Sequence, residues 1–188
     1  DENGGAGSPR PTFCVNGRKE KRMKIEQQNQ ILGCMNDVLN QNGFRAEIMQ
    51  KDGAPTILRC EAMRQGKVAK DVVIEACFIP ILLQFFVTLF QGAPENNKVQ
   101  LRHACDYCNN FCALGSFGFF EEAGQIYLKH NTLVDGSLEL EKIIPFVADN
   151  ISVLIAAVSR FIDGLAQIAY AGMTLDAVIE QDLFPKLG

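Results

Sequence analysis

The 188-residue chain has no tryptophan and only two histidines, His103 and His130. So few imidazoles leave few candidates for a general base or a metal ligand. The chain also lacks the G-x-S-x-G elbow of serine hydrolases, a glycine-rich phosphate loop and the H-E-x-x-H zinc motif. We therefore predict that the protein is not an enzyme, and a small enzyme with an unrecognised site stays as an alternative.

A basic excess is also missing, because 18 Lys and Arg residues stand against 22 Asp and Glu residues, for a net charge of −4. Nucleic-acid-binding proteins usually carry a basic face, so we predict no nucleic-acid partner. No secretory signal pattern opens the chain, and its seven cysteines are an odd number. These features predict free thiols in a reducing, cytoplasmic environment.

The longest apolar stretch, ACFIPILLQFFVTLF over residues 76–90, is short for a membrane span. Pro80 and Gln84 interrupt it. Val, Ile and Phe dominate residues 71–90, which favours two buried strands, and we predict no membrane contact.

Residues 1–22 are rich in Gly, Pro and charge, and they predict a disordered N-terminal tail before a single domain at 23–188. Hydrophobic periodicity divides that domain into helices and strands. Helices are expected at 24–40, 96–112 (capped by Asn96), 137–172 (capped by Ser137 and ended by Gly172) and 175–181 (capped by Thr174), and strands at 44–50, 56–63, 71–79, 81–90, 114–121 and 125–131.

The long helix carries the strongest pattern in the chain, an apolar stripe with spacings of three and four residues. The stripe consists of Leu140, Ile144, Val147, Ile151, Leu154, Val158, Phe161, Leu165 and Ile168. Pro145 lies off this stripe and predicts a kink or restart. A helix with such a stripe needs a flat apolar surface beneath it. We therefore predict an α+β fold with two layers, an antiparallel sheet packed by helices, in the order helix, strands, helix, β-hairpin, long helix.

Four potential metal ligands, His103, Cys105, Cys108 and Cys112, form the string H-x-C-x-x-C-x-x-x-C. Thiolates and imidazole bind zinc and iron–sulfur clusters, so a metal- or redox-sensing regulator is an alternative function. Structural zinc sites usually draw on two separate knuckles, and no second C-x-x-C is present. On a helix the three cysteines extend the stripe begun by Leu101, so we predict that they pack as small apolar residues, without metal or other cofactor.

The strands have more apolar surface than one helical layer covers. Leu83, Phe85, Val87 and Leu89 alternate with a second set on the opposite face, and Phe120 and Tyr127 face away from Phe117, Phe119, Ile126 and Leu128. The second face either has its own cover within the monomer or binds something. We predict a partner-binding or dimer surface formed by Phe86, Phe90, Phe120 and Tyr127.

Three parts of the second half of the chain resemble a known family: residues 101–112 with Asn109-Asn110, the hairpin GSFGFFEEAGQIYLKH at 115–130, and the Asp135-Gly136 step into a long helix. The family is the YbjN family, which has the type III secretion chaperone-like fold. The resemblance covers roughly residues 23–181, and the apolar region 72–90 and the cysteine-rich helix depart from it. It implies a small cytosolic protein, often dimeric, without known catalytic residues, and the related chaperones bind extended segments of other proteins. We therefore expect a non-enzymatic, homodimeric and chaperone-like binder of partner protein segments.

Overall fold

The computed structural model describes residues 23–62, 66–67, 72–80 and 82–187. The tail predicted at 1–22 lies outside these residues. The elements are α1 (Ile25–Gln41), β1 (Arg45–Met49), β2 (Ile57–Ala62), β3 (Val72–Ile79), β4 (Leu82–Phe90), the 3₁₀ helix η1 (Glu95–Asn97), α2 (Lys98–Asn109), β5 (Ser116–Phe120), β6 (Gln125–Leu133), α3 (Leu140–Ala171) and α4 (Leu175–Glu180). This order confirms the predicted α+β fold.

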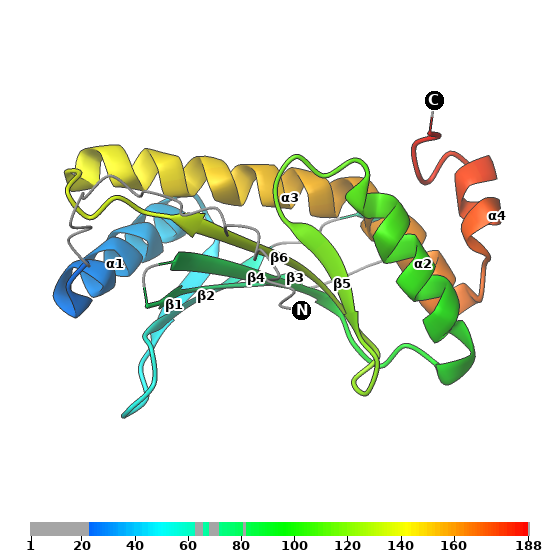
Figure 1. Cartoon of the computed structure of the whole chain (residues 1–188), viewed down its shortest axis with the longest axis horizontal. Helices are drawn as coiled ribbons and strands as arrows, with labels where there is room; N and C mark the ends of the chain where they lie inside the picture. Colours follow the sequence, from blue (N-terminus) through cyan, green and yellow to red (C-terminus); the bar gives the residue numbers. More distant parts are fainter. Residues whose placement is uncertain (1–22, 63–65, 68–71, 81, 188) are drawn as a thin grey trace, which may run out of the picture.

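The six strands form one antiparallel sheet in the order β1-β2-β3-β4-β6-β5. The four strands before α2 follow one another across the sheet, and the later hairpin adds to it through β6. Figure 1 shows α1 and α3 on one face of an arched sheet, α2 and α4 at the β5 end, and no described helix on the other face. We call the uncovered side the open face.

Buried and partly exposed residues alternate strictly in the two central strands, and this alternation gives the sheet one buried face and one open face. In β3 and β4 every second residue is buried, among them Ile74, Ala76, Phe85 and Val87, and the residues between them are partly exposed. A period of two places alternate side chains on opposite faces. The apolar core therefore lies between the sheet and the helical layer.

The stripe of α3 meets this core as predicted. Leu154, Val158 and Phe161 have no exposed surface, whereas Leu140 and Ile144, near the start, are only half-buried. The helix is one element through Pro145, so the predicted restart there does not occur. Pro145 removes only one backbone hydrogen bond near the beginning of a 32-residue helix, and the buried stripe holds the rest.

Two predicted helix starts are wrong. Ser137 does not cap α3, because its N–H and its hydroxyl both donate to Asp135 Oδ1, at 2.9 and 2.7 Å, and the helix begins at Leu140. Asn96 does not cap α2 either, since η1 precedes that helix. Gly172 does end α3 in the left-handed region (φ 69°), and Thr174 caps α4 by accepting from the Ala177 N–H.

Helix α3 is long and apolar enough to cross a membrane by length and composition, with a mean hydropathy of 1.6 over its most apolar window. Half of that window is buried inside the protein. The core helix of a folded domain passes the same test, so this helix is weak support for a membrane span.

Candidate protein-interaction surface

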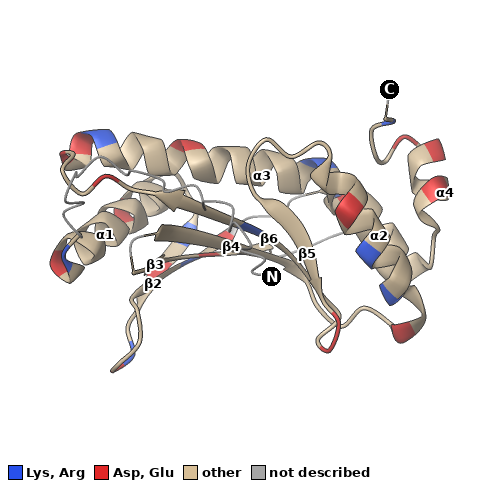
Figure 2. Ribbon diagram, in the orientation of Figure 1, with Lys and Arg blue, Asp and Glu red and all other residues tan. Residues whose placement is uncertain are grey.

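The open face has a polar half and an aromatic half. Across β1, β2 and β3, the antiparallel register places Glu47 beside Arg59 and Arg59 beside Glu75. Opposite charges on neighbouring strands favour this pairing of the strands. The strands β4 and β5 carry no charged residue, and β6 between them carries one, the exposed Lys129 opposite Phe86. Figure 2 shows this part of the sheet as largely tan, with a blue segment on β6.

Three aromatic rings stack on the half formed by β4, β6 and β5, and we call Phe86, Phe120 and Tyr127 the aromatic cluster. The Tyr127 ring lies 4.5 Å from the Phe120 ring and 4.9 Å from the Phe86 ring, measured between centroids. Phe120 is 47% exposed, and the other two rings are partly exposed. The three rings therefore form one partly exposed apolar patch, in which each ring is held in position by its neighbours.

Gly118 makes room for the cluster. It lies directly opposite Tyr127 in the β5–β6 register, and a Cβ atom at position 118 would overlap the tyrosine ring. The Tyr127 side chain therefore lies flat across the bare backbone of β5. This arrangement brings Tyr127 against Phe120, which lies two residues after Gly118 in β5.

Phe90, the fourth predicted residue, is not part of the cluster. A β-bulge between Thr88 and Phe90 shifts the register, so Phe90 lies opposite Ile126, a residue of the buried face. Its ring instead contacts Tyr170 near the end of α3, with centroids 5.4 Å apart. The Tyr170 hydroxyl donates to the Gln91 carbonyl at 3.0 Å, which ties this pair to the end of β4.

One asparagine side chain bonds to the main chain of each edge strand of the sheet. At the β1 edge, Ala46 donates its N–H to Asn40 Oδ1 (3.1 Å), and Asn40 Nδ2 donates to the Ala46 carbonyl (3.0 Å). At the β5 edge, Phe117 donates to Asn109 Oδ1 (2.6 Å), and Asn109 Nδ2 donates to the Phe117 carbonyl (3.0 Å). Each amide makes the two bonds that a neighbouring strand would make. Ala46 and Phe117 are therefore closed to strand addition.

We expect Asn109→Ala to lower the free energy of unfolding by about 1–3 kcal/mol, because it leaves a partly buried N–H and C=O of Phe117 without partners. Urea denaturation measures the loss. The matched control is Asn110→Ala, because the exposed Asn110 amide bonds only to carbonyls of its own helix. The control should change stability by less than about 0.5 kcal/mol, and an equal loss in both variants would contradict the role of Asn109.

The cysteine-rich helix does not form a metal site in the described part of the chain. Cys105 and Cys108 are buried, Cys112 is half-buried beyond the end of α2, and His103 is exposed. Burial, with a smaller contribution from Asp106, raises the pKa of the Cys105 thiol to about 12, and burial also raises the pKa of Cys108. The thiolate is the metal ligand and the nucleophile, so this environment disfavours both chemistries. No group of three His, Cys, Asp or Glu residues among those described is placed to hold a metal.

His130 has a structural partner that the sequence did not reveal. It is half-buried on the helix-covered side of β6, where its Nε2 lies 3.0 Å from Oδ1 of the buried Asn150. Asn150 Nδ2 donates in turn to the Phe146 carbonyl at 2.7 Å. The histidine thereby joins β6 to α3, which accounts for a polar pair inside the apolar layer.

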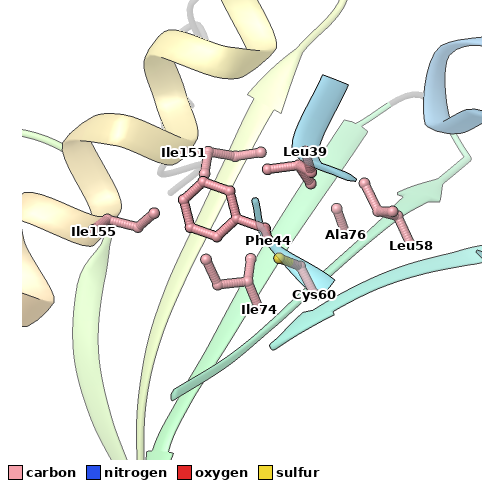
Figure 3. A pocket seen from close by; sticks show the side chains of 8 residues that line it. All are labelled: Leu39, Phe44, Leu58, Cys60, Ile74, Ala76, Ile151 and Ile155. Atoms are coloured by element: carbon pink, nitrogen blue, oxygen red, sulfur yellow. The ribbon is translucent and has the colours of Figure 1, made fainter. Parts of the chain in front are cut away.

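A small cavity of about 10 Å³ lies between the helical layer and the sheet, and Figure 3 shows its apolar lining. The lining residues are Leu39, Phe44, Leu58, Cys60, Ile74, Ala76, Ile151 and Ile155. Burial, and to a lesser extent Glu61, raises the pKa of the Cys60 thiol to about 11. Catalytic pockets are larger and contain convergent polar groups, so this cavity gives the enzyme alternative no support.

No family model, curated protein sequence or solved structure matches this chain. The arrangement of its own side chains is therefore what bears on its function.

Proposed function

We propose that the protein is a non-enzymatic interaction module of the cytoplasm that binds segments of partner proteins on the open face, in the manner of a chaperone. The observation that carries this proposal is the aromatic cluster, a stacked apolar surface on a sheet face with no helix over it. The resemblance to the YbjN family, whose members are often dimeric, agrees with it, and a homodimer is part of the proposal.

The geometry favours a segment that lies on the face over one that extends an edge. Asn40 of α1 and Asn109 of α2 bond to the edge strands, so main-chain pairing at Ala46 and Phe117 is closed. A partner segment on the open face would therefore dock mainly through side chains. Apolar side chains of the partner would pack on the aromatic cluster, and polar ones would meet the alternating charges of β1 to β3, as in the apolar centre and polar rim of protein interfaces.

Panning a displayed random-peptide library against the purified protein tests the proposal. Selected peptides should lose at least about 30-fold in affinity for Phe120→Ser, because truncating an aromatic anchor typically costs about 2 kcal/mol. Val99→Ser is the matched control, since Val99 is 63% exposed on α2, away from the open face. Affinity that falls equally in both variants, or a library that yields no binder, would contradict the proposal.

A further inference from the structure

The bonds of Asn109 to Phe117 show which way the backbone N–H and C=O groups of β5 and β6 point. Both backbone groups of Phe117 point away from β6, toward Asn109. In an antiparallel ladder the direction alternates from residue to residue, so Ser116 and Gly118 point toward β6. Their register partners Lys129 and Tyr127 therefore point toward β5. By the same alternation, Asn131 and Leu133 also point toward the β5 side.

The strand β5 does not reach these two residues. It begins at Ser116, opposite Lys129, whereas β6 continues to Leu133, and Figure 1 shows β6 extending past β5. The chain leaves the sheet at Gly115, which has a left-handed φ of 74° and lies close to the Lys129 carbonyl and to Leu154 of α3. No described residue forms a backbone hydrogen bond with Asn131 or Leu133 on this side. We call Asn131–Leu133 the open half-edge.

Exposed apolar side chains surround the open half-edge. Leu133 itself is 61% exposed, and Leu138, which follows it in the chain, is 43% exposed. Leu133 pairs with Leu82 of β4, and Leu82 pairs in turn with Ile79 of β3, which is 41% exposed. On the helix side, Phe146 is 42% exposed, and its carbonyl is linked through Asn150 to His130, the residue before Asn131. Apolar side chains therefore lie on both sides of the unpaired backbone, and on the open face they adjoin the Asn131 amide, which accepts from Gln84 Nε2 at 2.9 Å.

We propose that the open half-edge pairs antiparallel with the same half-edge of a second copy of this chain, around a two-fold axis beside Thr132. Self-pairing places Asn131 of each copy opposite Leu133 of the other, so that the outward main-chain groups of both residues are satisfied and the contact closes after two chains. A half-edge of two outward-facing residues is short for holding an unrelated extended peptide. A stable dimer needs about 800 Å² per partner, which is more than a strand end supplies. The exposed Phe146 and Val153 on the first half of α3 continue the apolar surface beyond the strand.

The inference goes beyond the proposed function, because it assigns self-association and partner binding to different surfaces. The predicted dimer surface on the aromatic cluster would then be free for a partner. The two statements can fail separately, since one concerns the mass of the protein and the other concerns peptide affinity.

Light scattering at micromolar concentration tests the inference, and it should give twice the 20.8 kDa mass of one chain. Leu133→Pro should give a monomer with an unchanged far-ultraviolet spectrum, because proline at the last residue of an edge strand removes only an outward N–H. Leu133→Lys should also give a monomer, because it places two like charges on either side of the axis, within the apolar contact. The control Val99→Lys should remain a dimer. A monomeric wild-type protein, or a dimer unaffected by either Leu133 substitution, would overturn the inference. Monomeric Leu133 variants should bind the selected peptides as the wild-type protein does.

Discussion

We expect Val158→Asp to abolish folding of the domain. Val158 has no exposed surface and lies in the middle of the α3 stripe, against the sheet. A carboxylate there would be buried without a partner, at a cost of several kcal/mol, and a typical domain has only about 5–15 kcal/mol of total stability. Circular dichroism and thermal denaturation of the purified variant measure the effect.

The matched control is Ala156→Asp, which adds the same charge two residues earlier on the exposed side of α3. It should keep the wild-type spectrum and change the free energy of unfolding by less than about 0.5 kcal/mol. If the protein tolerated both substitutions equally, α3 would not lie on the sheet with the face described above.

Gly164→Ala should destabilise the protein by about 1–3 kcal/mol, although alanine is the better helix former. A Cβ atom at position 164 would overlap the ring of Phe184 and come within 2.9 Å of Val178 Cγ1. Phe184 is 1% exposed and packs edge-to-face on Phe161, with centroids 5.6 Å apart. The substitution therefore displaces the C-terminal segment from α3. Urea denaturation gives the magnitude.

Gly33→Ala is the control, and it should not lower the free energy of unfolding. Gly33 also lies within a helix, α1, but a Cβ atom there would meet nothing within 4 Å. Without a clash, the substitution should be neutral or should stabilise the protein by up to about 1 kcal/mol. If Gly164→Ala were as well tolerated as Gly33→Ala, the packing of Phe184 against α3 would be wrong.

The sequence predicted those parts of the fold in which one hydrophobic period runs for many residues. The three-and-four spacing of α3 and the alternation of residues 72–90 each extend over several turns or pairs, so the long helix, the central strands and their two faces follow from them. The predicted starts of the helices depended on single polar residues. Ser137 was misassigned because its groups bond to Asp135, a local competition that the spacing of apolar residues does not reveal.

The aromatic cluster was partly predictable for the same reason. Phe86, Phe120 and Tyr127 follow from alternation within their strands, and Gly118 opposite Tyr127 could have been found from the hairpin register. Phe90 was misplaced because alternation fails at a β-bulge.

The asparagines that close the edges had no distinguishing signal in the sequence. Asn40 and Asn42 stand two positions apart at the end of α1, and only Asn40 reaches the next strand, whereas the Asn42 amide bonds to Val38 in its own helix. Which of them closes the edge depends on the direction in which the chain leaves the helix, and a tertiary contact of this kind has no local pattern.

The location of a bound segment tests the central claim of this account most directly. The measurement is the aromatic ¹H–¹³C spectrum of the protein with and without a library-selected peptide. The account predicts that peptide binding shifts the ring signals of Phe86, Phe120 and Tyr127 and leaves those of Phe161 and Phe184 in the core unchanged. Shifts confined to Phe44 beside the apolar cavity or to Phe146 beside the open half-edge, with the aromatic cluster unaffected, would contradict it.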